Sequence, residues 1–98
     1  MKDLISKYVI VRTYSAGVHA GTLASQCGRE VLLTDTRRLW YWDGAASLSQ
    51  IARDGVKKPE NCKFSVAISM ILLTEAIEVM PCTTDGENSI RRVEEWTA

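Results

Sequence analysis

The segment Tyr8–Tyr14 constrains the fold most strongly, because it consists almost entirely of β-branched and aromatic residues. Such residues favour a strand, in which successive side chains face opposite sides. Ser15–Gly17 then predicts a turn, after which Val18–Leu23 can return as a second strand. Gly21 within that strand permits a bulge or a close backbone approach. The chain therefore begins with a predicted antiparallel hairpin.

Further strand signals follow. Glu30–Thr34 and Arg38–Trp42 predict a second hairpin around the polar triplet Asp35–Arg37, which makes the first half of the chain a meander of short strands. Three more strands are predicted in the second half, at Phe64–Ile68, Met70–Leu73 and Ile77–Met80.

Two short helices complete the predicted elements. Helix Ser47–Asp54 is indicated by a Ser-x-x-Gln capping box at its start and a glycine directly after its end. A second capping box, Thr84–Glu87, predicts a helix whose apolar stripe passes through Ile90, Val93 and Trp96. Together these elements predict an α+β fold. We expect a single domain, residues 1–98, with a curved antiparallel sheet or small barrel of about six strands and two short helices.

Charge and cysteine usage exclude several classes of function. The 12 basic and 12 acidic side chains cancel, which argues against strong nucleic-acid binding but not against a small anion held by local arginines. The longest apolar run, Val66–Leu73, is far shorter than the roughly 20 residues of a membrane span. Cys27, Cys62 and Cys82 show no CxxC spacing, so we expect reduced thiols in a cytosol. We expect no metal site and no cofactor.

His19 is the single histidine of the chain. A catalytic interpretation would pair it with Ser15 or Cys27 as nucleophile, but the sequence contains no Gly-x-Ser-x-Gly motif. A hydrogen-bonded histidine in a strand or turn is one alternative, and a ligand contact is another. We therefore predict that the protein is not an enzyme.

The turn Ser15–Gly17 is a candidate anion site, because backbone N–H groups converge where a glycine takes positive φ. Arg12 and Tyr14 share one strand face directly before this turn, which favours binding. An ordinary hairpin turn is the alternative.

The segment Arg37–Trp42 is the most unusual in the chain. In a strand, Arg38, Trp40 and Trp42 would share one face. An arginine beside an indole suits a nucleotide, since the ring stacks on the base and the guanidinium binds a phosphate. Alternatively, Trp40 and Trp42 cover a helix or a second subunit, because three tryptophans exceed the needs of so small a core.

Four stretches, Tyr8–Gly21, Arg37–Leu48, Lys58–Phe64 and Ile77–Thr83, resemble a family of small phage-encoded proteins filed as a domain of unknown function. The resemblance covers most of the chain and includes no catalytic signature. More loosely, a compact phage protein of this kind is similar to the viral sponges that sequester nucleotide immune signals, which are oligomers that bind the signal without cleaving it. This analogy carries over no individual residue.

These observations lead to a functional hypothesis. We expect a non-enzymatic phage protein that acts in the host cytoplasm as a homo-oligomer and sequesters a small nucleotide-like ligand. Its predicted ligand-binding residues are Arg12, Tyr14, Ser15, Gly17, His19, Arg38 and Trp40. The alternative is a protein-interaction module that inhibits a host protein through exposed aromatic residues.

Overall fold

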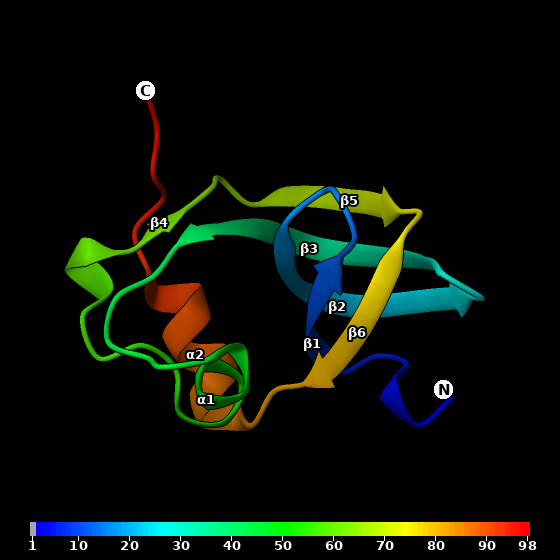
Figure 1. Cartoon of the computed structure of the whole chain (residues 1–98), viewed down its shortest axis with the longest axis horizontal. Coiled ribbons are helices and arrows are strands. Elements are labelled where there is room, and N and C mark those ends of the chain that lie inside the picture. Colours follow the sequence, from blue (N-terminus) through cyan, green and yellow to red (C-terminus); the bar gives the residue numbers. More distant parts are fainter. Residues whose placement is uncertain (1) are drawn as a thin grey trace.

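The computed structural model describes the backbone of residues 2–98 and the side chains of residues 3–98. One antiparallel sheet of six strands dominates it, and two α-helices pack at one end of the sheet (Figure 1). The predicted α+β class is confirmed. The elements, in chain order, are η1 (Lys2–Leu4), β1 (Tyr8–Thr13), β2 (Val18–Cys27), β3 (Glu30–Tyr41), α1 (Leu48–Asp54), η2 (Pro59–Asn61), β4 (Lys63–Phe64), β5 (Ile68–Leu73), β6 (Ala76–Pro81) and α2 (Thr84–Arg92).

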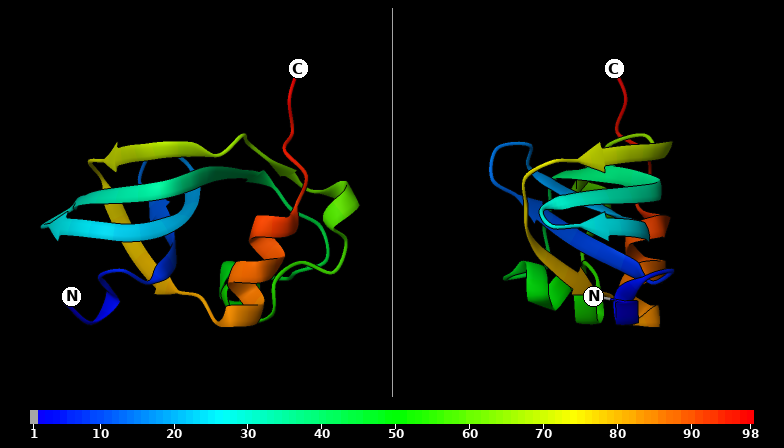
Figure 2. Two further views of the ribbon diagram at one scale, coloured as in Figure 1. Left: turned by 180° about the vertical axis from the view of Figure 1, so that it is seen from behind. Right: turned by 90° about the vertical axis from the view of Figure 1, so that its right-hand side faces the viewer.

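The order of the strands leaves the sheet open between β5 and β6. β3 pairs with β2 along one edge and with both β4 and β5 along the other, while β1 joins β2 to β6. β5 and β6 are consecutive in the chain but diverge instead of pairing (Figure 2). Within residues 2–98, each of these two strands therefore keeps one edge without a strand partner.

The long strand β3 replaces the predicted second hairpin, and that prediction is wrong. Glu30–Tyr41 is one strand of 12 residues, and the triplet Asp35–Arg37 lies inside it. Asp35 has a φ of 48°, and the β2–β3 register shifts beside Gly21. The triplet is therefore a bulge that bends the strand. A Cβ on Gly21 would lie 2.7 Å from the Thr36 Cβ, so the predicted close approach is confirmed.

The predicted strand Phe64–Ile68 is also wrong, because β4 ends at Phe64 and β5 begins at Ile68. Ser65 explains the interruption: its Oγ accepts a hydrogen bond of 2.8 Å from the Arg38 N–H, in the place of a backbone carbonyl. The other two predicted strands correspond to β5 and β6.

The helices begin at capping residues, as predicted. Ser47 Oγ accepts from the Gln50 N–H at the start of α1. The N-cap of α2 is Thr83, whose Oγ1 accepts from the Gly86 N–H. The predicted N-cap, Thr84, is therefore one residue further along the chain than the actual one. α2 ends at Arg92, and Trp96 lies in the tail outside the helix, contrary to the predicted stripe.

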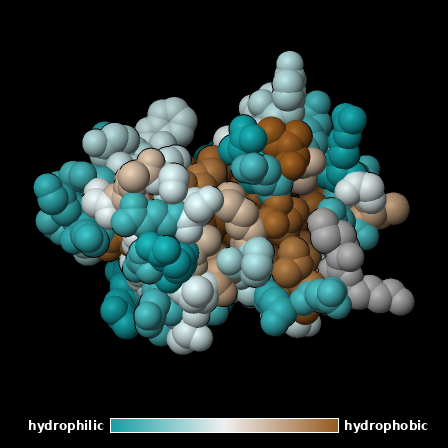
Figure 3. Space-filling model, turned by 60° about the horizontal axis from the view of Figure 1, so that its bottom comes forward, coloured by the Kyte–Doolittle hydropathy of each residue, from teal (hydrophilic) through white to brown (hydrophobic). Residues whose placement is uncertain are grey.

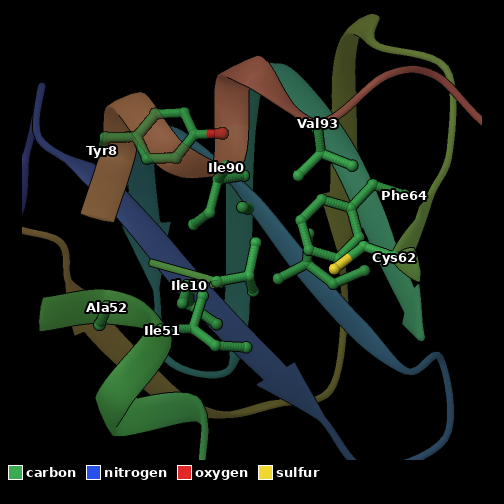
Figure 4. Packing of buried hydrophobic residues seen from close by; sticks show 11 residues of the cluster. Tyr8, Ile10, Ile51, Ala52, Cys62, Phe64, Ile90 and Val93 are labelled. Carbon is green, nitrogen blue, oxygen red and sulfur yellow. The ribbon is translucent and has the colours of Figure 1, made fainter. Parts of the chain in front are cut away.

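Two groups of buried apolar side chains hold these layers together. One consists only of strand residues inside the curve of the sheet: Val9, Val11, Leu23, Val31, Leu33 and Leu73. The other lies between the sheet and the helices (Figure 4) and includes Tyr8, Ile10, Ile51, Phe64, Ile90 and Val93. The alternation of Val9 and Ile10 between the two groups shows that β1 is buried on both faces.

The described part of the chain bears on three further expectations. No helix within residues 2–98 is long and apolar enough to cross a membrane. In the same range, no three His, Cys, Asp or Glu side chains come together in a way that could hold a metal ion. Cys27, Cys62 and Cys82 are free thiols in the structure.

Candidate ligand-binding site

A groove of about 660 Å³ lies between the β1–β2 turn and the end of β3. We call it the Trp40 groove. Its lining residues are Ser15, Ala16, Gly17, Val18, Arg38, Leu39, Trp40 and Trp42. The structure thus brings four of the residues predicted from sequence, Ser15, Gly17, Arg38 and Trp40, into one concave surface.

The guanidinium of Arg38 is available to a ligand. Strand alternation points Arg38 outward and buries its neighbour Arg37, which is only 6% exposed. Among the residues that the structure describes, no side chain or carbonyl accepts a hydrogen bond from the Arg38 guanidinium. A phosphate in the groove would therefore meet a cation that is not already paired.

The indole of Trp40 is the exposed aromatic surface of the groove. It is 64% exposed and follows Arg38 by two residues, so both project from the same face of β3. Side chains in this relation stand roughly 6–7 Å apart along a strand, a separation suited to a base on the ring and its phosphate on the guanidinium. Trp42 is instead partly buried against the core between sheet and helices.

The turn that forms the other wall is held by Thr13. Its Oγ1 accepts from the Ala16 N–H at 2.8 Å and donates to the Gly17 carbonyl at 2.8 Å, while Gly17 has a φ of 82°. Ala16 therefore cannot donate to an anion. The N–H groups of Ser15 and Gly17 have no hydrogen-bond partner among the described residues. Of the turn's predicted backbone donors, only these two can therefore bind an anion.

His19 contacts the turn from its buried side. The side chain is 1% exposed, and Nε2 lies 2.9 Å from the Ala16 carbonyl. Since a carbonyl only accepts, Nε2 carries the proton. Burial lowers the pKa of His19, against the raising effect of this hydrogen bond, and the nearby Arg38 charge lowers it further. His19 does not line the Trp40 groove; with Arg38 it borders an adjacent pocket of about 130 Å³.

The two nucleophiles considered for His19 are engaged or placed elsewhere. Ser15 Oγ donates to Glu75 Oε1 at 2.7 Å, and Cys27 is the last residue of β2, opposite Glu30. Neither side chain forms a hydrogen bond with the imidazole in the described structure.

Arg12 and Tyr14 lie outside the groove. The Arg12 Nε donates to Glu78 Oε1 at 2.8 Å in an exposed ion pair. Tyr14 is 78% exposed and lines a separate hollow beside the same turn.

Sequence reasoning missed the residues that hold the turn in shape. Thr13 could have been found locally, since a threonine three residues before an N–H commonly accepts from it. Glu75 could not, because it lies 60 residues from the Ser15 hydroxyl that it binds.

The lowered pKa of His19 predicts a pH-dependent stability. The unfolded chain binds a proton near pH 6.5, while the native state binds it only at lower pH. As pH falls below about 6.5, the free energy of unfolding should therefore fall, by at most about 1.4 kcal/mol per pH unit. Urea denaturation between about pH 7.5 and 5, a range that spans the ordinary pKa of histidine, measures this slope.

His19→Gln provides the matched control, because an amide can still donate to the Ala16 carbonyl but does not titrate. The slope should be flatter in this variant. An unchanged slope would assign the pH dependence to other groups.

Solved structures with a similar fold are oligomeric proteins. The chain is similar to an archaeal Sm protein whose crystal structure is described as heptameric, with a TM-score of 0.54 and 18% identity over 84% of this chain and 94% of that one. It is equally similar to the SmAP1 heptamer of P. aerophilum, with a TM-score of 0.54 and 18% identity over 84% and 86% of the two chains. At this identity the likeness shows an Sm-like fold.

Sequence comparison gives a family without a described activity. No curated protein matches the chain. The model of one family, described as "Domain of unknown function (DUF6948)", matches residues 6–90. The chain therefore belongs to this family of domains of unknown function.

Proposed function

We propose that the protein binds and sequesters a small nucleotide-like ligand, without chemical conversion, as a homo-oligomer. The observation that carries this proposal is the Trp40 groove. In it, the Arg38 guanidinium, which has no partner among the described residues, and an exposed indole project from the same strand.

The chemistry of the groove suits a nucleotide better than a simple anion or a purely apolar molecule. The Arg38 fork can bind two phosphate oxygens at once. Stacking of a base on Trp40 contributes about 1–3 kcal/mol. The Ser15 and Gly17 N–H groups lie on the opposite wall and can donate to further oxygens.

Binding without cleavage is supported by the state of the potential catalytic groups. Ser15 Oγ donates to the Glu75 carboxylate instead of the His19 imidazole, and that imidazole is buried under the turn. The resemblance to phage-encoded proteins is consistent with a nucleotide immune signal of the host as the ligand, and with action in the host cytoplasm.

The homo-oligomer is supported by the two outer strands. β5 carries Ile68, Met70 and Leu72 at alternate positions, and all three are exposed. β6, at the opposite end of the strand order, carries the exposed Ile77. On the face that Figure 3 shows, hydrophobic residues gather over the half that contains the long strands, whereas the helical half is mostly polar. Unpaired apolar edges of this kind are covered in most soluble proteins, and the similar Sm proteins are heptamers.

Replacing Arg38 by alanine should weaken ligand binding without unfolding the protein. The change removes a phosphate partner but no core volume, because the side chain is exposed. We expect a loss of about 1.5–3 kcal/mol, or about ten- to a hundredfold in affinity. Calorimetry against cyclic di- and trinucleotides and ADP-ribose isomers measures it, with the bound ligand recovered to confirm that it is intact.

Two other arginine variants serve as comparisons. Arg53→Ala removes an exposed arginine that is paired with its neighbour Asp54, and should leave binding unchanged. Arg12→Ala tests the predicted residue outside the groove: a loss equal to that of Arg38→Ala would move the site to the Arg12 face of β1. Absence of binding to the whole panel by the native protein would favour the alternative, inhibition of a host protein. A cleaved ligand would show that the protein is an enzyme.

A further inference from the structure

A second hollow, of about 540 Å³, lies beside the turn that walls the Trp40 groove. We call it the Tyr14 hollow. Its lining residues are Tyr14, Arg29, Glu75, Ala76 and Ile77. Tyr14, Arg29 and Glu75 come from three connections that are distant in sequence, β1–β2, β2–β3 and β5–β6, and Ala76 and Ile77 begin β6.

Backbone hydrogen bonds fix these three connections to one another. The Tyr14 N–H donates to the Glu75 carbonyl at 2.9 Å, and the Ala76 N–H donates to the Arg29 carbonyl at 3.0 Å. The Ser15 hydroxyl adds a bond to the Glu75 carboxylate. The hollow is therefore formed by the folded chain itself.

The Tyr14 hollow repeats the chemistry of the Trp40 groove. Each contains one exposed ring and one exposed arginine: Trp40 with Arg38, and Tyr14 with Arg29. No hydrogen bond or ion pair to the Arg29 guanidinium is found in the described part of the chain. The two concave surfaces meet at consecutive residues, since Tyr14 lines one and Ser15 lines the other.

Glu75 gives the second hollow its own selectivity. Its Oε1 accepts from Ser15, which leaves Oε2 to accept from an exocyclic amino group of a base. A phosphate would be repelled by this carboxylate and attracted to Arg29. The hollow therefore fits a base with an amino group better than a second phosphate alone.

We propose that the ligand consists of two linked nucleotides that straddle the β1–β2 turn. One base stacks on Trp40 with its phosphate on Arg38, and the other stacks on Tyr14 beside Arg29 and Glu75. This inference rests on the proposed function, because it extends the same site to a second base.

The test compares one nucleotide with two. Calorimetry is performed with adenosine 5′-monophosphate, the linear 5′-phosphorylated diadenylate and cyclic diadenylate, on native protein and on Arg29→Ala, Tyr14→Ala, Arg38→Ala and Arg53→Ala. For native protein we expect at least one diadenylate to bind about ten- to a hundredfold more tightly than the mononucleotide, as one more stacked base predicts. Arg29→Ala and Tyr14→Ala should remove this gain, so that these variants bind the diadenylates about as tightly as they bind the mononucleotide.

Arg38→Ala should weaken mono- and dinucleotide alike, and Arg53→Ala should weaken neither. Equal affinities of native protein for one and two nucleotides would overturn the inference while leaving the proposed function intact. The same conclusion would follow if Arg29→Ala and Tyr14→Ala had no effect on diadenylate. Absence of all binding to native protein would overturn both.

Discussion

Replacing Arg37 by methionine is expected to destabilise the fold by about 3–5 kcal/mol. Arg37 is 6% exposed and donates to four backbone carbonyls. These are Ser65 at 3.0 Å, Ile90 at 3.0 Å, Val93 at 2.8 Å and Phe64 at 3.2 Å.

The loss of stability is large because two of these carbonyls lie at the C-terminal end of α2. Ile90 lies in the last turn of the helix and Val93 is its C-cap, a position where the helix dipole favours a cation. The Phe64 and Ser65 carbonyls belong to β4 and its connection. The guanidinium therefore joins the end of the helix to the sheet. A methionine of similar volume would remove this donor from the Ser65 and Val93 carbonyls, while the Ile90 and Phe64 carbonyls would keep only the N–H groups of Val93 and Trp96.

Urea denaturation measures the effect, and the neighbouring residue supplies the control. Arg38→Met makes the same chemical change on the exposed face of the same strand, so it should alter the free energy of unfolding by no more than about 0.5 kcal/mol. Equal stability of the two variants would contradict the role assigned to Arg37.

These adjacent arginines show which parts of the structure could be predicted from the sequence and which could not. The alternation of a strand was sufficient to place Arg38 and Trp40 on one face, and the structure places both in one groove. The same reasoning assigned Arg37 to a turn. A buried arginine is unusual, and nothing in its local sequence indicates the helix end that it binds, 53 residues later in the chain.

The bulge in β3 explains the principal error in the fold. Asp35 with positive φ is typical of a turn, and the polar triplet lacks an apolar signal. The strand continues because Gly21 on β2 lets Thr36 approach closely, and because the Thr36 hydroxyl donates to the Ala20 carbonyl at 2.8 Å. Whether such a triplet ends or bends a strand depends on its partner strand, which local patterns do not reveal.

The β1–β2 turn was predictable as a turn and as a candidate anion site, but its detailed shape was not. Glycine and serine at these positions indicate reversal of the chain. Besides the local bonds of Thr13, the contacts that set its shape come from Glu75 and His19. Its position opposite Trp40 depends on the register of three strands. The sequence therefore supplied the residue types of the site, while tertiary pairing decided which of them meet.

The second large effect concerns assembly: Met70→Lys is expected to convert the proposed homo-oligomer into a monomer. Met70 is 57% exposed, at the centre of the apolar stripe of β5 between Ile68 at 46% and Leu72 at 55%. If the unpaired edge of β5 meets the unpaired edge of β6 in a second copy, the contact is head-to-tail and can close into a ring.

A lysine at the centre of that contact would bury an ammonium without a partner. The resulting penalty of about 3 kcal/mol or more corresponds to at least about a hundredfold weaker association. Light scattering at micromolar concentration should give a mass well above the 10.9 kDa of one chain for native protein, and a mass close to it for Met70→Lys.

Trp40→Lys distinguishes between the two surfaces on which a subunit could pack. Trp40 is 64% exposed, slightly more than Met70, but it lies in the groove and not on an outer strand. If the outer strands form the interface, Trp40→Lys keeps the native mass and loses only ligand binding. If instead Trp40→Lys yields monomers and Met70→Lys does not, the tryptophan face is the interface between subunits. A native protein that is already monomeric would refute the proposed assembly but not the groove, since all the residues that line it come from one chain.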